Sequence, residues 1–336
     1  MRIVKRGWWL TAVLAALILL AWLPEGAGAQ ERVKIRVGAI TQDAVDTIGP
    51  YAALKEGYYQ QEGLEPVLSY NINGPVTLQK MVAGDVDVAI STAIAPFFQA
   101  VASGVDLVWL ASTAKNNSPL VVRPEIKGIK DLEGKRVGTP GIGTIHDTLL
   151  SVFEKRHGIK TQHVYGRISD LFTYLEKGEV VGLISWQPPA ELARKKIGAH
   201  YLAKAVIPGA ESLGIIVPRA FVQKHRDVAK KFVKAHLRGI QYFQKHPQEF
   251  ARWLADREKL DLDVVRNITL DRDMISGENP VTDRETTKII IAAARDAGKI
   301  PKSLIPDDRA IEGWMEKHID ESILREAMKE VGWKDK

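Results

Sequence analysis

Short apolar runs alternate with amphipathic helical segments over the first two thirds of the chain. Residues 33–37 (VKIRV) alternate strictly between apolar and polar side chains, which is the period of a half-buried strand. The same reasoning predicts further strands around 66–70, 86–90 and 107–110, and helices over about 47–59, 74–83 and 93–102. This repeated strand–helix order predicts a doubly wound, mostly parallel α/β sheet.

The segment NGPVTLQKMVAGDVDVAI at 73–90 illustrates one such unit. Gly74 and the proline that follows it are typical of a helix start, because proline fits the first helical turn. Leu78, Met81 and Val82 recur at helical spacing and are predicted to form the apolar face of this helix.

A second α/β set is predicted after the loop KNNSP, followed by long helices. Its strands are expected at 121–122, 164–165 and 181–185, with a return strand in SLGIIVPRAF. Beyond Phe221 the pattern changes to long amphipathic helices. One face of the first of them carries Val228, Phe232, Ala235, Gly239 and Phe243.

The N-terminus has the pattern of a secretory signal. A basic head precedes an uncharged run over 8–23, and Ala27-Gly28-Ala29 supplies the small residues that signal peptidase accepts. An uncleaved anchor is the alternative, although a span usually needs about 18–20 apolar residues. We expect a signal peptide over 1–29, cleavage near Ala29/Gln30, and a periplasmic protein that is not a lipoprotein, since no cysteine follows the signal.

Composition removes several classes of function. The 336-residue chain has a net charge of +6, and without the predicted signal it keeps 44 basic and 40 acidic residues spread along its length. That distribution gives no support to nucleic-acid binding. The absence of cysteine excludes disulfides, thiolate metal sites and a cysteine nucleophile. With no G-x-S-x-G or H-E-x-x-H motif and scattered histidines, no catalytic residue, metal or cofactor is predicted.

The loop GTPGIGTIHD at 138–147 is the first candidate for ligand binding. It lacks the lysine of a phosphate-binding P-loop and the glycine spacing of a dinucleotide fingerprint. Thr144 or Thr139 can cap the following helix, and backbone N–H groups near Gly143 can face a polar or anionic ligand. An ordinary glycine-rich turn with a threonine cap is the alternative. His146 lies one turn into the same helix.

Other predicted strands end in polar or aromatic residues. Trp186 directly follows the strand at 181–185, and Ser91-Thr92 follows the strand at 86–90. Gln42 and Asp43 come shortly after the first strand. Because open α/β sheets bind ligands at the carboxyl ends of their strands, these groups are expected to converge. For Trp186 alone, core filling is an equal alternative.

Four segments carry a resemblance to a known family. YAALKEGYYQQEGLEPVL, GPVTLQKMVAGDVDVAI, IKGIKDLEGKRVGTPGIGT and GLISWQPPAELA resemble the periplasmic substrate-binding proteins of ABC importers, in the branch for nitrate, sulfonates, taurine and thiamine precursors. The resemblance implies the two-lobed, type II periplasmic-binding-protein fold, in which each lobe is a doubly wound, mostly parallel sheet. Lobe one would comprise 31–114 and the helical region 219–336, and lobe two 115–218, with hinge strands near 112–120 and 214–218.

The resemblance also implies a ligand site between the lobes. Its residues would be Gln42, Asp43, Gly74, Ser91 and Thr92 from lobe one, Gly141, Gly143, Thr144, His146 and Trp186 from lobe two, and Asn116 and Asn117 at the hinge. Two departures leave the ligand open: Gln187 replaces an acidic residue usual after the tryptophan, and Asp43 places a carboxylate where an anion would bind. A zwitterion, a heterocycle or an aromatic acid fits as well as a sulfonate, and His146 is the hypothesised specificity residue.

The function implied is capture of a small polar or anionic organic solute by lobe closure. The resemblance further implies a monomer that delivers the solute to a permease in the inner membrane with a cytoplasmic ATPase, without nucleic-acid partners. Three alternatives stay open: a ligand-sensing domain for a sensor or regulator, a binding protein for another transporter class, and a thiamine-pyrimidine-synthase-like enzyme. The last depends on a cysteine-rich motif in that family, and this chain has no cysteine.

Overall fold

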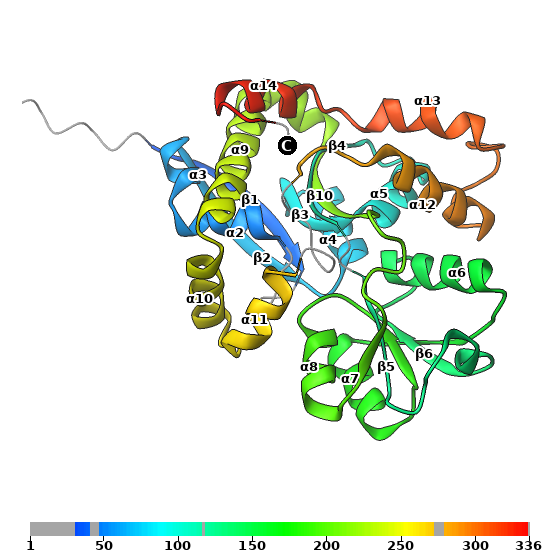
Figure 1. Cartoon of the computed structure of the whole chain (residues 1–336). Helices are drawn as coiled ribbons and strands as arrows, with labels where there is room; N and C mark the ends of the chain where they lie inside the picture. Colours follow the sequence, from blue (N-terminus) through cyan, green and yellow to red (C-terminus); the bar gives the residue numbers. More distant parts are fainter. Residues whose placement is uncertain (1–30, 41–46, 116–117, 272–278, 335–336) are drawn as a thin grey trace, which may run out of the picture.

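The chain folds into two α/β lobes, each built on its own sheet (Figure 1). The computed structural model describes residues 31–40, 47–115, 118–271 and 279–334. The predicted signal peptide and four of the predicted site residues, Gln42, Asp43, Asn116 and Asn117, lie outside these ranges.

The first sheet has five strands in the order β2-β1-β3-β10-β4. Their bounds are β1 Val33–Ile40, β2 Leu64–Asn71, β3 Val88–Ala93, β4 Leu107–Lys115 and β10 Glu211–Pro218. β1 pairs in parallel with β2 and β3, whereas β10 is antiparallel to both β3 and β4. Four strands therefore run in one direction, as the prediction of a mostly parallel sheet requires.

The second sheet repeats this arrangement in the order β7-β6-β8-β5-β9. Its strands are β5 Leu120–Val122, β6 Arg136–Thr139, β7 Gln162–Tyr165, β8 Gly182–Ile184 and β9 His200–Ala203. β5 is the single reversed strand here. In each sheet the reversed strand is the one that the chain enters after crossing from the other sheet, between β4 and β5 and between β9 and β10. The lobe boundaries at 114/115 and 218/219 stay predictions.

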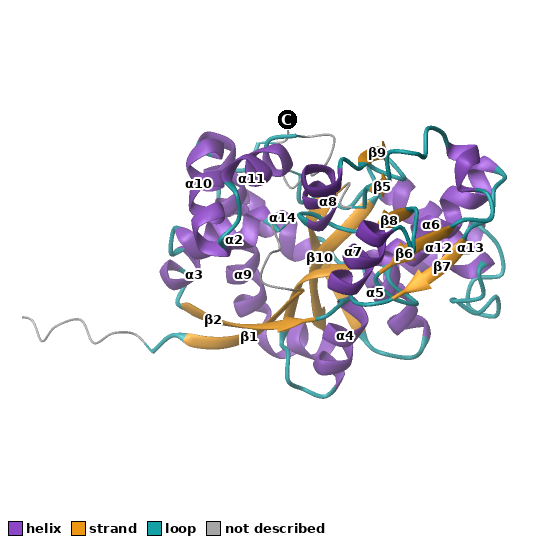
Figure 2. Cartoon of the chain, turned by 90° about the horizontal axis from the view of Figure 1, so that it is seen from below, coloured by secondary structure: helices purple, strands orange, loops and turns teal. Residues whose placement is uncertain are grey.

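Helices cover both faces of the sheets (Figure 2). Those among the strands are α2 Ile48–Lys55, α3 Tyr58–Gln61, α4 Gly74–Val82, α5 Ile94–Ala102, η1 Ile129–Leu132, α6 Ile145–His157, α7 Ile168–Lys177 and α8 Pro189–Ile197. The C-terminal helices are α9 Arg219–Lys245, α10 Pro247–Glu258, α11 Leu262–Thr269, α12 Arg284–Asp296, α13 Arg309–His318 and α14 Ser322–Glu330. No helix in the described ranges is long and apolar enough to cross a membrane.

Two local predictions need correction. The single helix expected over 47–59 is divided at Gly57, whose φ of +67° belongs to the left-handed region that favours glycine. Val82 is 62% exposed, while Leu78 and Met81 are buried as predicted. The helical spacing was right, but Val82 lies in the last turn of α4, where the helix leaves the core.

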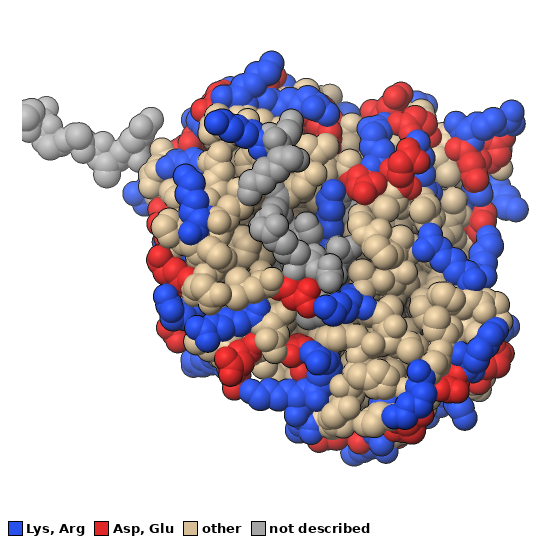
Figure 3. Space-filling model, in the orientation of Figure 1, with Lys and Arg blue, Asp and Glu red and all other residues tan. Residues whose placement is uncertain are grey.

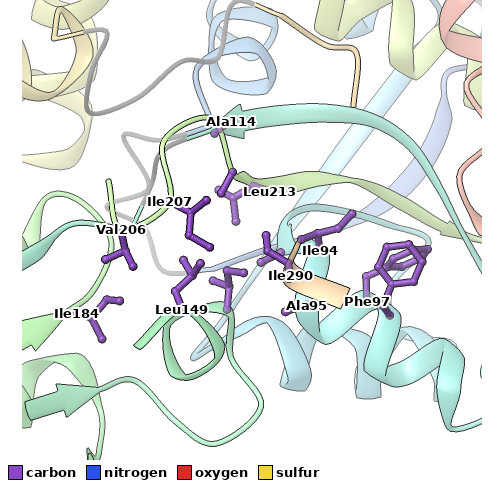
Figure 4. Packing of buried hydrophobic residues seen from close by; sticks show 14 of the residues in the cluster. Ile94, Ala95, Phe97, Ala114, Leu149, Ile184, Val206, Ile207, Leu213 and Ile290 are labelled. Atoms are coloured by element: carbon purple, nitrogen blue, oxygen red, sulfur yellow. The ribbon is translucent and has the colours of Figure 1, made fainter. Parts of the chain in front are cut away.

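One buried apolar cluster runs through both lobes (Figure 4). It includes Ile94 on α5 of the first lobe, Leu149 on α6 and Ile184 on β8 of the second lobe, and Ile290 on the C-terminal α12. A shared core of this kind means that the lobes are in close contact in this structure. On the surface, Lys and Arg are interspersed with Asp and Glu over the face that Figure 3 shows, in agreement with the even charge distribution in the sequence.

Candidate functional site

A cavity lies between the two sheets, where several strands end. Its first-lobe wall is formed by residues at the ends of β1 and β3 and the starts of α4 and α5: Ile40, Asn73, Gly74, Pro75, Ser91, Ala93 and Pro96. Its other wall is formed by Thr144, Ile145, His146 and Trp186 of the second lobe, and Leu213 on β10 of the first sheet completes the lining. The cavity therefore occupies the switch-point position at which open α/β sheets bind ligands.

Five of the predicted site residues line this cavity. They are Gly74, Ser91, Thr144, His146 and Trp186. Thr92, Gly141 and Gly143 lie next to the lining but are not part of it. Thr92 is fully buried, and a Cβ atom added at Gly74 would lie 3.1 Å from its Cγ2. The role of all twelve residues in ligand binding remains a prediction.

Three helices begin at the cavity, and two of them carry side-chain caps. The Asn73 side chain accepts a hydrogen bond from the backbone N–H of Val76 at 3.1 Å, so it caps α4. Thr144 accepts one from the N–H of Asp147 at 3.3 Å, which confirms its predicted role as the cap of α6. With the start of α5 at Ile94, three positive helix-dipole ends face the cavity.

Asn73 was missed by the sequence reasoning, although its signal was present. Asparagine directly before Gly74-Pro75 is a strong N-cap pattern. The helix start was predicted, but the sequence alone does not show that its cap lies at the cavity.

The Gly141–Thr144 loop makes a tight turn, and some of its polar groups form hydrogen bonds within the loop or with the helix that follows it. Gly141 has a φ of +149° and Gly143 a φ of +77°. The backbone N–H of Gly143 donates to Asp147 Oδ2 at 3.1 Å, and the Thr144 hydroxyl donates to the carbonyl of Gly141 at 2.7 Å. In this structure the Gly143 N–H is therefore paired with a carboxylate of the same helix, and the expectation that N–H groups near Gly143–Ile145 face a ligand stays a prediction.

Trp186 and His146 form the aromatic wall of the cavity. Their ring centroids are 5.4 Å apart with an interplanar angle of 50°. Trp186 is 6% exposed, and its buried Nε1 has no hydrogen-bond partner among the described residues. A buried N–H donor beside a cavity can pair with an acceptor on a bound solute. No Lys, Arg, Asp or Glu belongs to the described lining.

A cluster of charged groups around the buried Asp147 lies behind the Gly141–Thr144 loop. Asp147, which is 2% exposed, accepts hydrogen bonds from Tyr165 Oη at 3.0 Å and from Gly143, and it pairs with His163 Nδ1 at 3.2 Å. His163 Nε2 pairs with Glu154 Oε1 at 3.2 Å. Lys299, from the segment after α12, completes the cluster by an ion pair with Asp147.

The contacts within this cluster shift the pKa values of Asp147 and His163. Burial by itself would raise the pKa of the Asp147 carboxyl, but hydrogen bonds from His163 and Lys299 lower it well below its usual range. The hydrogen bonds of His163 to Asp147 and Glu154 raise the pKa of its imidazole to about 9 against the opposing effect of burial.

This raised pKa predicts a pH-dependent stability. A group whose pKa is higher in the folded than in the unfolded chain stabilises the fold fully below the unfolded value, here 6.5, and loses that effect as the pH rises through about 9. At pH 6 we expect the free energy of unfolding of the wild type to exceed that of His163→Gln by roughly 1–2 kcal/mol, after allowance for solvent screening. Urea unfolding of both proteins between pH 6 and 10 should show this difference shrinking with pH. A constant difference would contradict the assignment.

A second polar network lies behind Trp186. Gln187 is fully buried, and its Oε1 accepts a hydrogen bond from the N–H of Glu191 at 3.1 Å. The Glu191 carboxylate accepts hydrogen bonds from Arg194 at 2.7 Å, from Tyr201 at 2.8 Å and from Asn267 at 3.0 Å. The departure noted at Gln187 therefore belongs to the support of the aromatic wall, since Gln187 does not line the cavity. In the described ranges, no His, Asp and Glu group could hold a metal ion.

Comparison with known proteins identifies the family. The NMT1/THI5 like family matches residues 44–250, and the chain belongs to it. This confirms the family resemblance that the sequence motifs predicted. The fold is shared with the periplasmic nitrate-binding protein NrtA from Synechocystis PCC 6803, with a TM-score of 0.75 at 13% identity over 90% of each chain.

Two curated relatives match part of the chain. The taurine-binding periplasmic protein of Escherichia coli (strain K12) is 28% identical over 196 residues, 56% of this chain and 59% of the relative. The riboflavin-binding protein RibY of Chloroflexus aurantiacus is 24% identical over 214 residues, 59% of each chain. The matches thus span about three fifths of these relatives.

Proposed function

We propose that this protein is an exported solute-binding protein that captures a small polar or anionic organic solute between its two lobes and delivers it to an ABC importer. The observation that carries the proposal is the cavity between the sheets, bordered by the starts of α4, α5 and α6 and by Trp186. Membership of the family and the periplasmic relatives support it. No catalytic residue takes part.

The mechanism is capture by closure. Each lobe contributes one wall, so a solute that contacts both walls binds the closed form better than the open one and shifts the equilibrium toward it. Closure excludes water from the cavity. A solute that leaves one of its polar groups buried without a hydrogen-bond partner therefore loses about 1–3 kcal/mol of binding free energy. The cavity supplies three helix starts for an anionic or carbonyl group and an indole wall for an apolar or planar part.

The cavity lining restricts the ligand class more than the names of the relatives do. Without Lys or Arg in the described lining, an anionic group would be held by helix N-termini and N–H or hydroxyl donors. Because the remaining wall is largely apolar, the favoured solutes are organic and carry one polar or anionic group. Taurine and a flavin are the ligands in the names of two relatives, and both satisfy that description only in part.

A thermal-shift screen of residues 30–336 tests the proposal. The panel contains taurine, longer alkanesulfonates, nitrate, bicarbonate, pyrimidines, riboflavin and aromatic acids. A binding solute at a hundred times its Kd stabilises the folded chain by about 2.7 kcal/mol, which raises the melting temperature by several degrees. An unrelated protein of similar stability controls for nonspecific effects. A flat response to the whole panel, or turnover of a bound compound, would contradict the proposal.

A further inference from the structure

Two helices of the second lobe begin beside the cavity, and each carries a buried carboxylate in its first turn. Asp147 follows Thr144 on α6, and Glu191 follows Trp186 by five residues on α8. Asp147 is 2% exposed and Glu191 is 4% exposed. Neither lines the cavity. Both carboxylates are therefore placed just behind the residues that form its second wall.

Each carboxylate is bonded to a donor from the C-terminal helices. α12 lies against α6, and α11 lies against α8 (Figure 1). Lys299, directly after α12, forms the ion pair with Asp147. Asn267 on α11 donates to Glu191 Oε1 at 3.0 Å. α12 also packs on α5 of the first lobe, and α11 is connected to α2 of the first lobe through α10 and α9, so these two bonds cross between the lobes.

The same carboxylate-bearing residues hold the wall of the cavity. Asp147 Oδ2 accepts the backbone N–H of Gly143 at 3.1 Å, which fixes the turn before Thr144. The backbone N–H of Glu191 donates to Gln187 Oε1 at 3.1 Å, next to Trp186. A chain of contacts thus runs from each C-terminal donor, through one carboxylate residue, to one segment of the wall.

We propose that Lys299 and Asn267 are positioning residues that couple lobe closure to the shape of the second cavity wall. This inference rests on the proposed function, since it concerns the closure by which the solute is captured. When the lobes separate, Asp147 keeps His163 and Tyr165 as partners. Glu191 likewise keeps Arg194 and Tyr201, so the open form leaves neither carboxylate isolated.

Another ion pair between α6 and α12 is more exposed. Lys155 and Asp296 are joined at 3.0 Å, but their side chains are 76% and 38% exposed. Exposed pairs of this kind contribute little, because solvent screens them and long side chains lose freedom. The loss of one partner of a buried carboxylate has a much larger effect. Lys155→Met is therefore a matched control for Lys299→Met, since both remove one lysine charge from the α6–α12 contact.

The test measures the distance between the lobes without any solute. The chain has no cysteine, so spin labels can be attached to residues 30–336 through Lys177→Cys in the second lobe and Glu316→Cys in the first, both at exposed positions. We expect Lys299→Met to lower the ratio of closed to open molecules about tenfold and Lys155→Met to change it less than about twofold. Lys299→Arg should restore most of the closed population, because it restores the charge.

Backbone hydrogen exchange of residues 140–148 provides the readout of wall shape. Lys299→Met should speed exchange in this segment, and Lys155→Met should not, while circular dichroism checks that both variants are folded. Asn267→Ala should have a smaller effect of the same kind on residues 185–192. Equal effects of Lys299→Met and Lys155→Met, no effect of either, or a wild type that is wholly open would overturn the inference. Failure of the proposed function is a separate result: no solute would alter the wild-type distances.

Discussion

Replacing Trp186 by alanine is expected to weaken solute binding about a hundredfold while the protein stays folded. Trp186 is one side of the cavity and packs at an angle against His146. Its loss removes a large flat apolar surface and the buried Nε1 donor in one step. Central aromatic residues of binding sites commonly contribute 2 kcal/mol or more, and a hundredfold loss corresponds to about 2.7 kcal/mol.

The measurement is isothermal titration with the compound that gives the largest thermal shift. Trp253→Ala is the matched control, because Trp253 is a partly buried tryptophan on α10 that packs on Phe250 away from the cavity. It should bind as the wild type does. Similar affinities for Trp186→Ala and Trp253→Ala would show that the solute does not contact the predicted wall.

Replacing Gly239 by alanine is expected to destabilise the fold by about 3 kcal/mol. Gly239 lies where α9 crosses α2, and an added Cβ atom would meet the Gly49 carbonyl oxygen at 2.0 Å and the Ala53 nitrogen at 2.8 Å. Both atoms are backbone, so neither can rotate away, and the helices must separate. Overpacking a core costs typically 1–3 kcal/mol, and a backbone clash belongs to the upper end of that range.

Gly313→Ala provides the control for this prediction. Gly313 is also within a helix, α13, but an added Cβ atom would meet nothing within 4 Å. Alanine should therefore stabilise the chain there by up to about 1 kcal/mol, because it favours the helix more than glycine does. Urea unfolding of both variants gives the two values. If Gly239→Ala were as stable as Gly313→Ala, the close crossing of α2 and α9 would be incorrect.

The sheets were predictable because their signals are local. Alternating residues such as 33–37 and the apolar runs before Ser91 and Trp186 are properties of a few neighbouring positions, and they led to most of the strands. β9 at His200–Ala203 was missed, because its apolar run of three residues is short, only partly buried and without alternation. Gly239 was assigned to the correct helix face, but the sequence does not show that α2 lies directly against it.

The site was predictable only in part, for the same physical reason. Gly74, Ser91, Thr144 and Trp186 stand at strand ends or helix starts, and the fold brings such positions together. The contact between Asp147 and Lys299 joins residues 152 positions apart. No local pattern marks such a contact, because it depends on how the lobes and the C-terminal helices pack.

The distance between the lobes, measured with and without a bound solute, tests the central claim most directly. The chain labelled at Lys177→Cys and Glu316→Cys should show a mixture of longer and shorter distances alone. With a saturating amount of the compound that gives the largest thermal shift, the account predicts a single short distance. The same labels in Trp186→Ala should not respond at that concentration. A solute that binds tightly and leaves the wild-type distances unchanged would contradict capture by closure.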